Sequence, residues 1–209
     1  MFQKILILSP HTDDSELGCG GTIARFVEEG KNVHIAVFST CEESLPAGYP
    51  KETLYNEWKA AEHILGIPEN NLHCFRYPVR YFPDHRQEIL EHLIKFRDHL
   101  NPDLVFLPSL SDLHQDHRTI AEEGLRAFKG TSILGFEIPW NNIHFETRSF
   151  IYLERQHVEK KIKALACYKS QSFRGYADPD FIFSLAKTRG VQIEIPYAEA
   201  FETIRLIIK

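Results

Sequence analysis

The chain has 209 residues, of which 43% are hydrophobic and 25% charged, a composition typical of a soluble globular protein whose core folds without disulfides. The net charge of −5 provides no basic field for a polyanion and argues against nucleic acid or an anionic membrane as the main partner. The four cysteines stand far apart without a C-x-x-C pair, which argues against a zinc ribbon or a redox motif and fits a reducing compartment.

The first apolar run, "ILIL", is only as long as a strand, and no segment approaches the roughly 18 apolar residues of a membrane span. We therefore expect a cytoplasmic protein with no signal peptide and no membrane partner. A small molecule is the expected ligand, and homo-oligomerisation stays open.

Short β-rich runs alternate with amphipathic stretches along the chain. We predict strands over residues 2–8, 33–39, 72–77 and 104–108. We predict helices over residues 22–29, 52–65, 84–100 and 120–128, the first two of which end at Gly30 and Gly66. The segment "SILGFEIPW" is a further strand candidate, followed by a hairpin-like region and a helix whose apolar stripe holds Val158, Ile162, Leu165 and Ala166.

This alternation predicts an α/β fold with a mostly parallel sheet. The runs "ILIL" and "LVFLP" are hydrophobic throughout, as expected for strands that helices cover on both faces. A doubly wound sheet of order 3-2-1-4-5 would place the first and fourth strands side by side, with their carboxyl ends open on the crevice where ligands bind.

Two loops dense in histidine and aspartate follow these two strands. The segment "SPHTDDSE" follows the first strand, and "SLSDLHQDHRTIAEE" follows the fourth. Because the carboxyl ends of neighbouring parallel strands lie at the same edge of a sheet, we expect the two loops to face each other and to form one site.

The residue types in these loops suit a divalent cation. Imidazole and carboxylate bind borderline metals, and catalytic zinc usually takes three protein ligands and leaves a position for water. His114 and His117 can share a face at an expected helix start. Asp13 and Asp14 cannot easily both reach one ion, so we expect one ligand and one free carboxylate that takes a proton from an attacking water. A metal and a base indicate a hydrolase.

Each loop also has a purely structural interpretation. Asp13, Asp14 and Asp112 can cap turns by accepting hydrogen bonds from backbone N–H groups. For either loop alone this interpretation is about as good as the metal site. It is much weaker for two such loops at adjacent strand ends.

The glycine-rich segment "GCGGT" does not complete a dinucleotide-binding fingerprint, because Ile23 stands where the third glycine of G-x-G-x-x-G would fall. We interpret Gly20 and Gly21 as positions where the backbone passes close to the metal loop, with a helix starting at Thr22. The other histidines have no partner spacing and are interpreted as solvated, with His144 undecided: His34, His63, His73, His85, His92, His99 and His157.

The motifs "PHTDDSELGCGGTIA" and "HQDH" resemble the two signatures of the PIG-L/LmbE-like deacetylases, roughly P-H-P-D-D-E-x-x-G-x-G-G-T and H-P-D-H. The segments "KIKALACYKSQ" and "YAEAFE" are similar to that family as well, so the resemblance covers nearly the whole chain. It implies a Rossmann-like three-layer sandwich, with residues 1–209 as a single LmbE-like deacetylase domain. It also implies a zinc-dependent hydrolase, ferrous iron being the alternative, that removes an N-acyl group, usually acetyl, from an N-acetylglucosamine-type amino sugar or its conjugate.

The resemblance assigns roles to particular residues. His11, Asp14 and His117 match the metal ligands, and Asp13 matches the general base. His114 matches the histidine that stabilises the oxyanion or donates a proton, and Asp116 would orient a histidine.

Several positions depart from the family pattern. Thr12 and Gln115 replace the prolines of the two motifs, which we expect to alter loop stiffness rather than chemistry. Asp112 stands where some members carry a tyrosine that contacts the reacting carbonyl, so Asp112 is a substrate-binding candidate. Leu54 and Tyr55 occupy the region where many members have a substrate-binding arginine, which leaves the substrate open.

A different loop offers arginines for the substrate. The segment "RYPVRYFPDHR" contains Arg76, Arg80 and Arg86 beside Tyr77, Tyr81 and Phe82. Arginine forks suit phosphate or carboxylate, and aromatic faces suit sugar or base rings, so we predict that this loop binds an anionic aglycone, with Arg80 as the test residue. An exposed charged loop is an equally good interpretation.

Three other functions fit parts of the pattern. A metal-dependent phosphoesterase would use similar residues but usually more carboxylates for two ions. An amidase of the same family that acts on a thiol or glycan conjugate would share every site residue. A non-catalytic binding module on the same fold would have no use for Asp13 beside a metal site.

Overall fold

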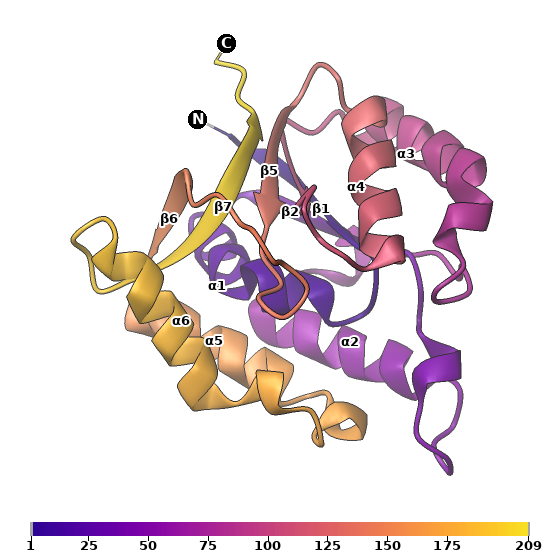
Figure 1. Cartoon of the computed structure of the whole chain (residues 1–209), viewed down its shortest axis with the longest axis horizontal. Coiled ribbons are helices and arrows are strands. Elements are labelled where there is room, and N and C mark those ends of the chain that lie inside the picture. Colours follow the sequence, from indigo (N-terminus) through magenta and orange to yellow (C-terminus); the bar gives the residue numbers. More distant parts are fainter. Residues whose placement is uncertain (1, 209) are drawn as a thin grey trace.

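The computed structural model describes residues 2–208, which form a seven-stranded sheet with helices on both faces (Figure 1). The strands are β1 (Lys4–Ser9), β2 (Asn32–Val37), β3 (Leu72–Cys74), β4 (Leu104–Pro108), β5 (Ser132–Phe136), β6 (Ser149–Leu153) and β7 (Tyr197–Arg205). The α-helices are α1 (Asp14–Glu28), α2 (Thr53–Leu65), α3 (Arg86–Leu100), α4 (Gln115–Ala127), α5 (Arg155–Leu165) and α6 (Pro179–Val191).

The strand order is β3-β2-β1-β4-β5-β7-β6. The first five strands are parallel and follow the predicted order, so β1 and β4 are neighbours, with Ile7 opposite Phe106. The strand predicted in "SILGFEIPW" is β5. Beyond it, β7 pairs antiparallel with β5, and β6 pairs antiparallel with β7 to form the edge. The predicted α/β fold with a mostly parallel sheet is confirmed.

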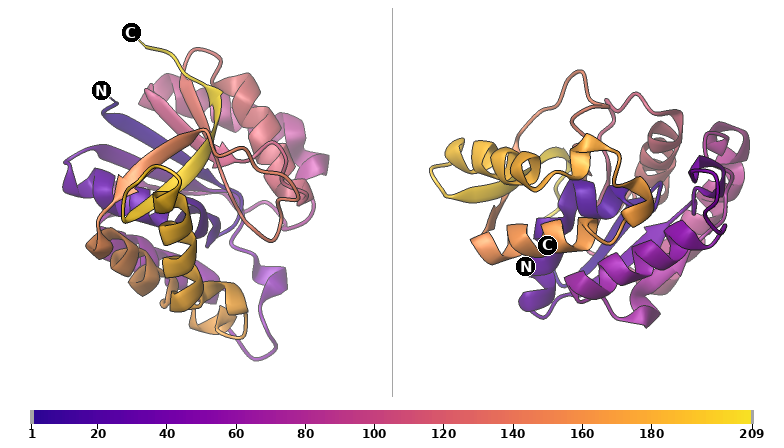
Figure 2. Two further views of the ribbon diagram at one scale, coloured as in Figure 1. Left: turned by 60° about the vertical axis from the view of Figure 1, so that its left-hand side comes forward. Right: turned by 90° about the horizontal axis from the view of Figure 1, so that it is seen from below.

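Two apolar cores lie on opposite faces of the sheet. Ile5 and Ile7 of β1 point into the core beneath α1, α2, α5 and α6, whereas Leu6 and Leu8 point into the core beneath α3 and α4. Figure 2 shows the two groups of helices from further sides. Successive side chains of a strand alternate between faces, and both faces are buried here. Burial on both faces explains why the sequence of β1 is an uninterrupted apolar run.

Helix α1 begins at Asp14, so the predicted start at Thr22 was wrong. The helix is interrupted at Cys19, whose backbone is non-helical. The Glu199 carboxylate accepts from the backbone N–H groups of Gly21 and Thr22 at 3.0 and 2.7 Å, and it thereby caps the second half of the helix. Lys161 donates to Leu17 O at 2.7 Å and also contacts Glu199. A buried ion pair from α5 and β7 therefore compensates the helix break.

The glycines of this segment allow close packing against the sheet and α5. A Cβ at Gly18 would lie 2.4 Å from the Phe136 ring, and one at Gly21 would lie 2.5 Å from Leu153. At Gly20 the nearest atom would be in the Lys161 side chain, at 2.9 Å. The interpretation that Gly20 and Gly21 pass close to the metal loop was therefore wrong.

Other local expectations differ from the structure. Strand β3 ends at Cys74 rather than residue 77, and α4 begins at Gln115 rather than residue 120. His34 and His157 are buried rather than solvated. His157 completes a capping box at the start of α5, and His34 contacts His73 at 3.2 Å. Within residues 2–208, every helix is too short or too polar to span a lipid bilayer.

Candidate metal centre and active site

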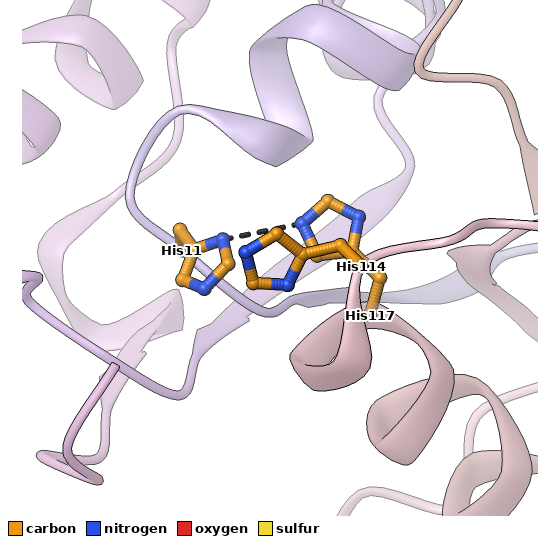
Figure 3. A group of neighbouring side chains, drawn as sticks. All are labelled: His11, His114 and His117. Atoms are coloured by element: carbon orange, nitrogen blue, oxygen red, sulfur yellow. Dashed lines mark hydrogen bonds between the residues drawn. The ribbon is translucent and has the colours of Figure 1, made fainter. Parts of the chain in front are cut away.

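The two histidine- and aspartate-rich loops meet at the carboxyl ends of β1 and β4. His11 follows β1, and Asp14 is the first residue of α1. His117 lies in the first turn of α4, one turn after His114, the N-cap of that helix. The strand order thus brings together residues about 100 positions apart in the sequence (Figure 3).

Three side-chain atoms converge at this point. His11 Nδ1 and His117 Nε2 are 3.1 Å apart, and Asp14 Oδ2 lies 3.1 Å from the former and 3.2 Å from the latter. Figure 3 marks the contact between the two imidazoles. All three residues are buried.

The remaining ring nitrogens face carboxylates. His11 Nε2 contacts Asp116 Oδ2 at 3.0 Å, and His117 Nδ1 contacts Asp112 Oδ2 at 2.8 Å. A carboxylate only accepts hydrogen bonds, and Asp14 faces the inner nitrogens as well, so a neutral imidazole whose inner nitrogen binds a metal keeps its proton on the nitrogen that faces Asp116 or Asp112. The nitrogens that face each other then present lone pairs, and Asp14 adds a third acceptor.

The electrostatic environment favours a positive charge between the two inner ring nitrogens and the Asp14 carboxylate. Burial opposes protonation of His117, but Asp14 and Asp112 raise its pKa to about 10. Burial likewise opposes ionisation of Asp14, but His117 and His11 hold its pKa well below the usual value. A tetrahedral ion with ligand bonds of about 2.0–2.1 Å separates neighbouring ligands by roughly 3.3 Å, close to the separations found here. The geometry and the donor set both fit a divalent cation.

Asp13 borders this triangle without joining it. It occupies the N-cap position of α1 and lines the adjoining cavity. Its Oδ2 accepts from the Tyr176 hydroxyl at 3.3 Å. Burial and the neighbouring Asp14 raise the pKa of Asp13, which makes this carboxylate a better proton acceptor than an exposed aspartate.

His114 lies beside the triangle of His11, Asp14 and His117 and differs from the two other histidines in its hydrogen bonding and its protonation. Its Nδ1 accepts from the backbone N–H of Asp116 at 3.2 Å. Burial and the neighbouring His11 and His117 lower the pKa of His114 to about 4, so the ring is neutral and its proton is on Nε2. His114 has a ring nitrogen within 4.8 Å of those of His11 and His117, but as a helix cap it is better suited to donate from Nε2 than to bind a metal.

Asp116 and Asp112 lie behind the two metal-facing histidines. Asp116 also accepts from the backbone N–H groups of Arg80 at 2.6 Å and Phe82 at 3.2 Å, which ties the loop after β3 to His11. Asp112 is only 1% exposed, and its second oxygen accepts from His114 N at 2.8 Å. Both Asp112 oxygens are therefore occupied within the protein.

Of the three loop arginines, only Arg80 lines the cavity. Arg76 is bound by Glu42 and Glu52, and Arg86 by Glu122 and Glu123. Acidic residues of neighbouring elements therefore already hold two of the three arginines, and the prediction for this loop rests on Arg80.

A family model described as PIG-L, GlcNAc-PI de-N-acetylase, matches residues 6–128, which is more than half of the chain. The chain belongs to the PIG-L family. The matched residues include both loops of the candidate metal centre.

The similar proteins and solved structures are distant in sequence. An uncharacterised deacetylase, YaiS of Escherichia coli K12, is 26% identical over 177 residues, which cover 79% of this chain and 90% of YaiS. The N,N'-diacetylchitobiose deacetylase of Pyrococcus horikoshii superposes with a TM-score of 0.81 at 19% identity, over 96% of this chain and 83% of that one. GalB, a 4-carboxy-2-hydroxymuconate hydratase of Pseudomonas putida KT2440, superposes with a TM-score of 0.79 at 21% identity, over 99% and 98% of the two chains. Structural likeness at these identities shows the fold alone.

The part of the PIG-L chain beyond residue 128 supplies one wall of the cavity, whose volume is about 410 Å³. Sequence reasoning did not identify its members: Ile138, Trp140, Asn141, Gln171, Arg174 and Tyr176. The sequence held one indication that Gln171 belongs to the site, because this residue ends the family-like segment "KIKALACYKSQ". The others lie in irregular segments whose approach to the site depends on the sheet topology.

Proposed function

We propose that the protein is a metal-dependent N-deacetylase that acts on an N-acetylglucosamine-type amino sugar or its conjugate, with residues 1–209 as one catalytic domain. Membership of the PIG-L family supports the reaction class. One observation carries the proposal: three buried acceptor atoms converge within 3.2 Å of one another, and Asp13 lies next to them at the edge of a cavity.

His11, Asp14 and His117 would hold the metal, which we propose to be Zn²⁺, with Fe²⁺ as the alternative. Two imidazoles and one carboxylate are a common ligand set for catalytic zinc, and affinity order and metal availability decide between the two ions. When bound, the ion supplies Lewis acidity, which lowers the pKa of water and polarises an amide carbonyl.

The other residues have separate roles in the proposal. Asp13 accepts the proton of the attacking water, and the neutral His114 donates a hydrogen bond from Nε2 to the oxygen of the tetrahedral intermediate. The protonated Asp13 then gives its proton to the amine nitrogen as the C–N bond breaks, which releases the amine and acetate. Asp116 orients His11, and Asp112 orients His117 rather than contacting substrate, because its carboxylate is fully occupied and buried.

Arg80 is the proposed contact for an anionic aglycone. It lines the cavity, and its guanidinium makes no ion pair within residues 2–208. A charged fork at the cavity wall without a carboxylate partner suits phosphate or carboxylate.

A pair of variants tests the assignment. Asp13→Asn should keep the wild-type metal content, measured by elemental analysis, and should lose most of the amine and acetate release from N-acetylglucosamine conjugates. His117→Ala should lose the metal together with turnover. Near-normal kcat in Asp13→Asn would remove the assigned base. A metal-loaded wild-type protein that hydrates an unsaturated acid but releases no amine would refute the deacetylase.

A further inference from the structure

Two aromatic rings form a stacked pair in the cavity wall. Trp140 lies in the loop after β5, and Tyr176 lies in a short 3₁₀ turn, Gly175–Ala177, before α6. Their ring centroids are 4.3 Å apart with an interplanar angle of 12°. Tyr176 covers one face of the indole, yet Trp140 remains 44% exposed and lines the cavity. An aromatic residue held in place beside a catalytic site, with exposed surface on the cavity, provides a preformed contact for a ligand.

Tyr176 connects this pair to the reacting end of the cavity. Its hydroxyl donates to Asp13 Oδ2 at 3.3 Å. Burial, followed by the negative charge of Asp13, raises the pKa of Tyr176 above its ordinary value, so the hydroxyl stays protonated and remains a donor. A ligand that rests on Trp140 is therefore next to the carboxylate proposed as the base.

Polar side chains surround the stacked rings. Asn141, Gln171 and Arg174 line the same cavity. Arg174 Nε is buried and has no hydrogen-bond partner within residues 2–208. Planar amide and guanidinium groups can bond neighbouring hydroxyls in pairs. The wall thus combines an apolar aromatic surface with hydrogen-bonding groups, and Arg174 Nε is a buried nitrogen that has no partner among the described residues.

We propose that Trp140 and Tyr176 form the platform that binds the pyranose ring of the substrate, with Arg174 bonding its hydroxyls. This inference rests on the proposed function and adds the residues that select a sugar. A pyranose presents C–H groups on one face and hydroxyls around its rim. The C–H groups are attracted to the negative face of an aromatic ring, and the rim hydroxyls match the polar side chains. The cavity volume of about 410 Å³ lies within the range of roughly 300–1,000 Å³ for small-molecule sites.

The tryptophan content allows binding to be followed by fluorescence, separately from amine release. The chain has two tryptophans, and Trp58 is 1% exposed in the core beneath α2. Titration of the metal-loaded protein with N-acetylglucosamine should change the tryptophan emission saturably. Acetamide, which has the amide without the ring, and muconate, a planar diacid, should cause no saturable change. Trp140→Phe should abolish the signal, and retention of the signal in this variant would assign it to Trp58 and overturn the platform. A saturable response to muconate but not to the sugar would also overturn it.

Steady-state kinetics of N-acetylglucosamine deacetylation separate the two rings. Trp140→Ala should raise KM about tenfold or more with kcat within twofold, and Trp140→Phe should restore most of the affinity because it keeps an aromatic face. Tyr176→Phe keeps the ring but loses the contact with Asp13, so it should lower kcat with little change in KM. Tyr49→Ala is the matched control, because Tyr49 is 46% exposed and does not line the cavity.

The emission titration and the kinetic assay test the sugar platform and the deacetylase separately, because either proposal can be refuted while the other stands. A saturable emission change without amine release would refute the deacetylase and keep the sugar platform. Amine release with an unchanged KM in Trp140→Ala would refute the platform and keep the deacetylase.

Discussion

Replacement of Asp112 by asparagine discriminates between a residue that orients a metal ligand and one that contacts substrate. One Asp112 oxygen accepts from His117 Nδ1 at 2.8 Å, and the other accepts from His114 N at 2.8 Å. Asparagine has only one oxygen. If this oxygen keeps the bond to His114 N, the amide NH₂ faces the proton on His117 Nδ1.

The imidazole of His117 would then have to move its proton to Nε2, the nitrogen that faces His11 and Asp14. A protonated nitrogen cannot bind a metal. Loss of such a supporting carboxylate typically costs about 10–100-fold in metal affinity, or roughly 1.4–2.7 kcal/mol. We expect the loss of metal affinity in Asp112→Asn to lie at the upper end of this range, near a hundredfold. In either orientation of the asparagine amide, its NH₂ group faces another N–H donor.

The assay is competition for Zn²⁺ between the protein and a chromophoric chelator. The matched control is Asp103→Asn, because the Asp103 carboxylate also accepts two hydrogen bonds, from the backbone N–H groups of Gln3 and Lys4, but lies at the opposite end of β1. Asp103→Asn should bind zinc like the wild type. Metal affinity within twofold of wild type in Asp112→Asn, together with a raised KM, would refute the orienting role and restore the substrate-binding interpretation.

Three further results are expected. Arg80→Ala should raise KM roughly tenfold for amino sugars with an anionic aglycone, with kcat unchanged, in steady-state assays of a charged and an uncharged conjugate. Glu199→Gln leaves the buried Lys161 without its counter-charge and should lower the free energy of unfolding by about 3 kcal/mol or more in urea titrations, part of which Lys161→Met in the same chain should restore. Burial and the neighbouring His73 lower the pKa of His34 to about 4, so the unfolded chain binds a proton more readily between about pH 6.5 and pH 4. The free energy of unfolding should therefore fall as the pH falls through that window, by up to about 1.4 kcal/mol per pH unit, and His34→Leu should reduce the slope.

Each of these expectations has a contrary result. An unchanged KM for the anionic conjugate in Arg80→Ala would remove Arg80 from substrate recognition. A loss below about 1 kcal/mol in Glu199→Gln would mean that the ion pair does not stabilise the break in α1. An identical pH slope in His34→Leu would show that other groups control the acid sensitivity.

The sequence predicts the half of the fold whose strands are buried on both faces. The uninterrupted apolar runs of β1 and β4 identify parallel strands. Because these two strands are neighbours in the sheet, His11 and His117 come together. The sequence does not predict where α1 begins. Its second half, after the break at Cys19, is capped by Glu199, which comes from the far end of the chain. Local propensity contains no information about a cap from so distant a residue.

The antiparallel edge and the cavity wall escaped prediction for the same reason. Strand β7 pairs with both β5 and β6, although about 60 residues separate it from β5 in the sequence. Trp140 and Tyr176 come from two irregular segments that only the folded chain brings within 4.3 Å. The metal loops could be found because their residue types have a characteristic chemistry at short spacing. A stacked aromatic pair has no such signature.

Chelation followed by metal restoration tests the central claim most directly. The protein is stripped with a chelator until elemental analysis shows no transition metal, and acetate release from an N-acetylglucosamine conjugate is measured before and after one equivalent of Zn²⁺ or Fe²⁺ is added. The proposed site predicts no turnover in the stripped protein and recovery at about one ion per chain. Undiminished acetate release by the metal-free protein would contradict it.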